Sequence, residues 1–134
     1  MLMTNHAAGT FEVTLTPQPR DGRAGTETLG RLSIDKQFHG DLEATSVGQM
    51  LAARTDMEDS AGYVAIERVS GVLHGRRGSF TLQHSGTMDR GEGQLVITVV
   101  PDSGTDQLIG LAGEMVIRVE GGTHFYDFEY AIGD

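Results

Sequence analysis

Cysteine is absent from this 134-residue sequence, and proline is rare, with three residues. The absence of cysteine excludes a disulfide framework and a zinc–thiolate site. Long apolar runs are also missing, and the N-terminal stretch has neither a basic region nor a sustained hydrophobic segment. We therefore predict no signal peptide and no membrane anchor, and we expect a cytoplasmic protein.

Positive charge is scarce as well. Ten Lys and Arg residues stand against 19 Asp and Glu residues, which gives a formal net charge of −9. Affinity for nucleic acid depends on Lys and Arg side chains that displace counterions from phosphates, and no dense basic block occurs here. We therefore expect neither nucleic acid nor an anionic membrane as a partner, and the acidity is typical of a soluble protein.

Glycine, in contrast, is abundant. The 19 glycines are scattered among segments rich in Val, Ile, Thr and Phe, which favours an all-β protein with many tight turns. Apolar and polar residues alternate with a period of two, the pattern of strands with one face on a core. The alternation predicts strands at 10–16, 28–38, 42–52, 63–69, 79–88, 94–100, 111–119 and 126–132. The segment 61–88 predicts a central β-hairpin, because two alternating runs meet at HGRRG.

The strands follow one another without a helical pattern of 10 to 15 residues between them, which favours an antiparallel meander. Closure into a barrel removes the exposed edges that an open sheet would leave. We therefore predict an all-β protein with a single closed antiparallel barrel of about eight strands over residues 1–134, with 1–8 as a flexible N-terminal segment. The interior of such a barrel is either filled by side chains or holds one small ligand.

Three local questions stay open at this level. The segment SVGQMLAAR at 46–54 contains good helix formers and could end as a helix, although Gly48 and the short length count against this. Gly71 predicts a bulge or a sharp bend. Both faces of the strand 63–69 are partly apolar, so the pattern does not decide which face is inward.

Three ionisable residues fall on strand faces that also carry apolar side chains. Lys36 lies between Ile34 and Phe38, and His84 shares its face with Leu82. Glu67 is the natural partner of either residue if its face is inward, because a buried carboxylate must be paired or protonated. The alternatives are a lysine that extends to a barrel rim, a purely structural histidine, and surface ion pairs.

The surface ion pair that we consider involves the neighbour of Glu67. Arg68 points to the opposite face of its strand, where Glu114 or Glu43 could pair with it. The five histidines include no pair at metal-ligand spacing, so we predict no metal site. The segment SGTDQLIGLAG lacks the lysine and the strand–loop–helix context of a phosphate site, and no serine stands in a nucleophile elbow. We expect no cofactor.

Four segments carry a family resemblance between Gly9 and Ile132. They are KQFHGDLEATSVGQML, AGYVAIERVSGVLHGRRGSFTLQHSGTM, VVPDSGTDQLIGLAGEM and HFYDFEYAI. In their order and spacing the sequence resembles the bacterial domain-of-unknown-function family 3224, small proteins with a lipocalin-like barrel similar to that of plant allene oxide cyclase. The resemblance implies the barrel and self-association but no established activity. It carries over no catalytic residues, because a fold does not fix a function.

The placement of ionisable residues on apolar faces favours a binding module over an enzyme. We expect a small, mostly apolar molecule in the barrel, oriented by a few polar side chains. The candidate ligand-binding residues are Lys36, Phe38, Glu67, Phe80, His84, Met88, Tyr126 and Phe128. One alternative is a cyclase or isomerase in which Glu67 or His84 moves a proton. The other is a solid barrel that forms a homo-oligomer through an outer face with Val64 and Ile66, or with Val96 and Thr98.

Overall fold

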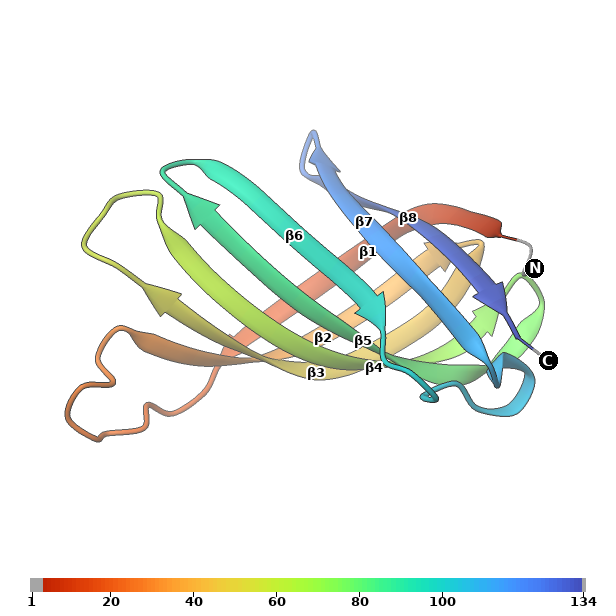
Figure 1. The fold of residues 1–134 in the computed structure, drawn as a ribbon, viewed down its shortest axis with the longest axis horizontal. Helices are drawn as coiled ribbons and strands as arrows, with labels where there is room; N and C mark the ends of the chain where they lie inside the picture. The colour runs from red at the N-terminus through yellow and green to blue at the C-terminus, as the bar shows by residue number, and fades with distance from the viewer. Residues whose placement is uncertain (1–3, 134) are drawn as a thin grey trace.

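Eight antiparallel strands run through residues 4–133, the part of the chain that the structure, a computed structural model, describes (Figure 1). Each strand pairs with the next along the sequence, and the first pairs with the last to close a barrel. The strands are β1 (Asn5–Pro17), β2 (Leu29–Gly40), β3 (Leu42–Arg54), β4 (Ala61–Leu73), β5 (Arg76–Asp89), β6 (Glu92–Val99), β7 (Leu111–Glu120) and β8 (Thr123–Ile132). A short 3₁₀ helix, η1 (Asp106–Leu108), lies between β6 and β7. No helix in this range is long and apolar enough to cross a membrane.

This architecture confirms the predicted all-β fold and closed antiparallel barrel. The predicted central hairpin is β4–β5, and its turn has positive φ angles at both His74 (45°) and Gly75 (79°). Two successive positive φ angles are typical of a type I′ turn, whose twist matches that of the two strands it joins. Glycine adopts this backbone without a steric penalty, so the HG pair at 74–75 fixes the register of the hairpin.

The first strand is longer than predicted. It begins at Asn5, and residues 5–8 pair with residues 127–130 of β8. The prediction of a flexible segment is therefore wrong for 5–8, because the pairing with β8 holds them in the barrel wall. Residues 1–3 of that segment lie outside the described residues.

Two of the open local questions have plain answers. Residues 46–54 are strand throughout and pair with both β2 and β4, so the helical alternative is wrong. Gly71 is not a bulge, because β4 pairs without interruption with β3 and β5 from 61 to 73. A Cβ atom at Gly71 would lie 2.2 Å from the carbonyl oxygen of Glu43 and 2.6 Å from the Cβ atom of Ala44. The glycine is needed for the close approach of β3.

The inward face of β4 is also settled by the structure. Glu67 and Val69 are fully buried, whereas Val64 and Ile66 on the opposite face are half exposed. The cross-strand partners of Glu67, which are Gly48 and Leu82, lie on the inner wall as well. Glu67 therefore points into the barrel.

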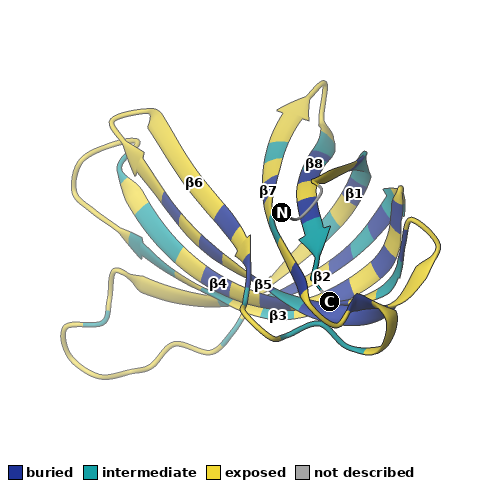
Figure 2. Cartoon of the chain, turned by 45° about the vertical axis from the view of Figure 1, so that its right-hand side comes forward, coloured by how far each residue is buried: buried dark blue, intermediate teal, exposed yellow. Residues whose placement is uncertain are grey.

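A hydrophobic core fills only one end of the barrel. Phe38, Phe80, Leu73 and Phe128 are fully buried there, and Leu108 of η1 packs into the same core. We call this end the filled half. In Figure 2 the buried residues gather on the strand segments at this end.

At the other end the inner wall is in contact with water. Inward-facing side chains there are between 42% and 58% exposed, namely Leu15, Met88, Leu95 and Val119. The cause lies in β6 and β7, which pair only at Ile97↔Met115 and Thr98↔Glu114. Figure 2 shows the two strands diverging from this short contact. We call this end the open half.

Candidate functional site

The inner wall carries a buried cluster of charged and polar side chains. Lys36 comes from β2, Ser46 from β3, Glu67 from β4 and His84 from β5. The side chain of Glu67 is fully buried, and those of Lys36 and His84 are 6% and 5% exposed. The structure therefore brings together the three ionisable residues that the sequence singled out. Their proposed role in binding a ligand stays a prediction.

Glu67 is the centre of this cluster. Its Oε2 atom accepts hydrogen bonds from the Nζ atom of Lys36 at 2.8 Å and from the Nε2 atom of His84 at 2.5 Å. Its Oε1 atom accepts a hydrogen bond from the hydroxyl of Ser46 at 2.8 Å. Among the described residues, no buried side-chain nitrogen or oxygen lacks a hydrogen-bond partner. The cluster is thus a complete network in which charge is buried without an unsatisfied group.

The carboxyl group of Glu67 is ionised. Burial is the largest influence on its pKa and raises it, but the hydrogen bond from His84 and the charge and hydrogen bond of Lys36 together outweigh burial. The result is a pKa lowered from 4.5 to about 2. An ionised carboxylate only accepts hydrogen bonds, so the Nε2 atom of His84 must carry a proton.

Tyr63 extends the cluster toward the open half. Its hydroxyl lies 3.3 Å from the Nδ1 atom of His84, and its side chain is partly exposed. When the imidazole is neutral, the proton on Nε2 leaves Nδ1 as an acceptor for the hydroxyl of Tyr63. Burial, and then the charge of Glu67, raise the pKa of Tyr63, which keeps its hydroxyl protonated. A hydrogen-bonded chain therefore runs from the fully buried carboxylate to a phenol on the water-exposed inner wall.

Two glycines make room for these side chains. A Cβ atom at Gly48 would lie 2.2 Å from the carbonyl oxygen of Ile66 and 2.6 Å from the Cα atom of Glu67. A Cβ atom at Gly86 would lie 2.5 Å from the ring of Tyr63. Glycine at these positions lets β3 approach Glu67 closely and lets the ring of Tyr63 lie against β5.

The predicted aromatic residues lie in the filled half. Phe80 stacks on Phe128 with ring centroids 5.8 Å apart, and Phe38 meets Tyr126 edge-on at 5.6 Å. Of these rings Phe38 is the one next to the charged cluster, because the Nζ atom of Lys36 lies 5.6 Å from its centroid. The other three are buried in the hydrophobic core.

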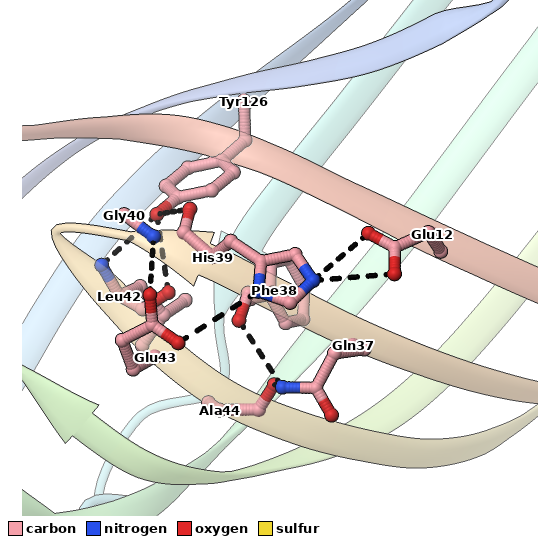
Figure 3. A network of polar contacts seen from close by, with 9 residues as sticks. All are labelled: Glu12, Gln37, Phe38, His39, Gly40, Leu42, Glu43, Ala44 and Tyr126. Carbon is pink, nitrogen blue, oxygen red and sulfur yellow. Dashed lines mark hydrogen bonds and ion pairs between the residues drawn. The ribbon is translucent and has the colours of Figure 1, made fainter.

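Tyr126 belongs to a separate polar network at the β2–β3 turn (Figure 3). Its hydroxyl donates to the carbonyl oxygen of His39 at 3.0 Å and accepts from the backbone N–H of Leu42 at 2.9 Å. Burial raises its pKa to about 12. Beside it, Glu12 and Glu43 flank the exposed ring of His39, 2.9 Å and 3.8 Å from its nitrogens. Tyr126 therefore fixes a turn rather than joining the Glu67 cluster.

Met88, a candidate ligand-binding residue, has a side chain that is 42% exposed because β5 runs beyond the filled half, and its role in binding stays a prediction. One prediction about a single residue is wrong. Arg68 does not pair with Glu43 or Glu114, and instead donates a hydrogen bond to the hydroxyl of Ser79 at 2.9 Å. No group of three or more His, Asp or Glu side chains suited to a metal ion occurs within residues 4–133.

Sequence reasoning missed Tyr63 and Ser46 as members of the cluster. Tyr63 shares the alternating face of Glu67 four residues away, which is a usable signal once that face is known to be inward. Ser46 lies directly opposite Lys36 across the β2–β3 pair. Its role depends on the register, which the sequence pattern alone does not supply.

The chain is similar to known proteins over nearly its whole length. A family model described as "Protein of unknown function (DUF3224)" matches residues 7–130. Among solved structures, the chain is similar to a protein with unknown function from the DUF3224 family of Shewanella oneidensis MR-1. The two share 47% sequence identity and a TM-score of 0.92, over 98% of this chain and 99% of that one. No curated protein matches the chain.

Proposed function

Because the chain belongs to the DUF3224 family, whose description assigns no activity, we propose a function from the geometry of the barrel. The protein binds a small, mostly apolar molecule in the open half, and the polar end of this molecule meets Tyr63 and Lys36. An eight-stranded barrel is wide enough to hold one small ligand in this way, as lipocalins do. The proposal rests on one observation, the position of the buried charged cluster.

The cluster lies where the filled half gives way to the open half. A buried ion pair such as Lys36–Glu67 is rarely the most stable filling for a core, since apolar residues of similar size often do as well or better. Stability alone therefore does not explain why the protein has this buried ion pair. Its chain of hydrogen bonds leads to Tyr63, on the part of the inner wall that water reaches. A cluster at this depth is suited to orient a ligand that enters from the open half.

The surroundings support an apolar ligand with one polar group. The exposed inner wall offers Leu15, Met88, Leu95 and Val119, which suit an apolar body. Lys36 has three N–H donors and uses one on Glu67, while the rings of Phe11 and Phe38 lie within 4.9 Å and 5.6 Å of its Nζ atom. Its remaining donors, together with the oxygen of Tyr63 as an acceptor, suit a single polar group that both accepts and donates a hydrogen bond, such as a hydroxyl.

Titration with Nile red, an uncharged apolar dye, tests this proposal. We expect saturable binding with one dye per chain, and an affinity that falls about tenfold or more in Leu95→Asp because a carboxylate enters the apolar wall. The matched control is Val116→Asp on the outer surface of β7, where the valine is 62% exposed. Absence of saturable binding, or equal loss in both variants, would refute the proposal.

A second candidate function rests on the chain Glu67–His84–Tyr63. Such a chain moves a proton between a bound molecule and the imidazole, and would assist an isomerase or cyclase. The assay is exchange of the α protons of 2-decanone, an apolar ketone, for deuterium in D₂O, followed by NMR. If this function is correct, the wild type accelerates exchange and Tyr63→Phe and His84→Gln do not, although both still bind Nile red. Equal exchange in all three proteins would contradict it.

A further inference from the structure

The outer surface of the barrel carries a patch of exposed large apolar side chains over neighbouring strands. Its members are all at least half exposed, namely Val47 and Leu51 of β3, Val64 and Ile66 of β4, and Val96 of β6. Leu51 lies opposite Val64, and Val64 and Val96 both lie opposite Ser85 of β5. The five side chains thus form one continuous surface, which we call the outer apolar face. A contiguous apolar patch of this kind marks an interaction site more often than scattered apolar residues do.

This face is almost free of charge in a strongly acidic protein. The outward positions of β3, β4, β5 and β6 at 45–53, 62–70, 79–87 and 94–98 hold one charged residue, Arg68, and no carboxylate. Each of the other strands carries at least one acidic residue at an outward position, namely Glu12 of β1, Asp35 of β2, Glu114 and Glu120 of β7, and Asp127 and Glu129 of β8. Glu43, Asp89 and Glu92 lie at the ends of β3, β5 and β6, beyond these ranges, so the centre of this surface carries no acidic residue.

The charge distribution points to a second copy of this chain as the occupant. Two copies with a net charge of −9 repel each other over most of their surfaces. Contact through the centre of the outer apolar face avoids opposing carboxylates. We propose that this face is the interface of a twofold homodimer, in which the β3–β4 surfaces of two copies pack against each other.

The proposal is independent of ligand binding, because it uses the outward faces of the strands and leaves the inner wall free. Uncharged hydrogen-bonding side chains on the outer apolar face support the homodimer further. Gln49 and Gln83 lie on either side of Ile66 across the strand pairs. In a twofold arrangement an amide can pair with an amide of the other copy, since each offers both a donor and an acceptor.

Sedimentation velocity over a hundredfold dilution series tests the dimer. The chain has a mass of 14.4 kDa, and we expect wild-type protein to sediment with twice this mass at the higher concentrations. Ile66→Glu is expected to weaken dimerisation about a hundredfold, because it brings a carboxylate from each copy into the interface. The control Val116→Glu changes a more exposed apolar residue, on β7 outside the face, and should leave the dimer intact.

Far-UV circular dichroism shows whether each variant keeps its strand content. If Ile66→Glu fails to fold, Val47→Glu replaces it, since Val47 is 62% exposed and lies at the edge of the same face. Wild-type protein that remains monomeric throughout the series would overturn the proposal. So would a dimer that survives both substitutions in the face, or one that Val116→Glu disrupts equally.

Discussion

Replacement of Glu67 by Gln is expected to lower the free energy of unfolding by about 3 kcal/mol at neutral pH. The magnitude follows from the pKa of Glu67, which the folded protein lowers from 4.5 to about 2. Each unit of difference in pKa between the folded and the unfolded state corresponds to about 1.4 kcal/mol of free energy of unfolding. Gln preserves the size of the side chain but not the charge that Lys36 and His84 face. The loss agrees with the cost of breaking other buried ion pairs, about 3 to 5 kcal/mol.

The same difference in the pKa of Glu67 makes the stability of the protein depend on pH. Because the pKa of Glu67 is lower in the folded than in the unfolded protein, folding favours the deprotonated carboxyl group. Its contribution is complete well above pH 4.5 and is lost as the pH falls through the unfolded-state value toward about 2. In Glu67→Gln this carboxyl group is absent, so this part of the acid sensitivity should disappear.

Urea unfolding followed by far-UV circular dichroism, at several pH values from about 2 to 7, measures both effects. Glu114→Gln is the matched control, because it makes the same chemical change at an exposed position of β7. We expect Glu114→Gln to follow the wild type and Glu67→Gln to show a flatter dependence on pH. An unchanged stability of Glu67→Gln at neutral pH, or an acid dependence equal to that of the wild type, would refute the reasoning.

Three further predictions concern neighbouring residues. Lys36→Met alone should cost about 3 to 5 kcal/mol, and the double variant with Glu67→Met should recover most of this in urea unfolding, since no unpaired charge then stays buried. Gly48→Ala should cost about 1 to 3 kcal/mol because its Cβ would meet β4, whereas Gly30→Ala, with open space around its Cβ, should cost little. Tyr63→Phe should leave the melting temperature nearly unchanged but shift the Nδ1 resonance of His84 in ¹⁵N NMR, since it removes one hydrogen bond.

Much of the fold could be predicted because the alternation of apolar and polar residues is strong in most strands. In β5, for example, Phe80, Leu82 and His84 alternate with polar residues and are all buried. The same rule was ambiguous in β4, where Val64 and Ile66 are as apolar as the residues on the inner face. Which face of β4 points inward depends on its pairing with β3 and β5. The turns and the packing of the whole barrel determine that pairing.

The site could be predicted only in part. A charged residue on an apolar face, such as Lys36, is visible in the sequence, and the need to pair it pointed to Glu67. The hydrogen bonds of Ser46 and Tyr63 depend on cross-strand register and could not be predicted. The open half could not be predicted either, because it results from the short pairing of β6 with β7 and not from the pattern of either strand. For the same reason Met88, on an apolar face, turned out to be exposed.

The central claim, that the open half of the inner wall binds an apolar molecule, is tested most directly by NMR of ¹³C-labelled methionine methyl groups. Met50 and Met88 lie on the inner wall at the open half, Met115 lies in the core, and Met57 is exposed in the loop between β3 and β4. Addition of Nile red should shift the methyl resonances of Met50 and Met88 in a saturable way and leave those of Met57 and Met115 in place. Saturable shifts at Met57 with none at Met50 and Met88 would contradict the claim, and so would the absence of any shift.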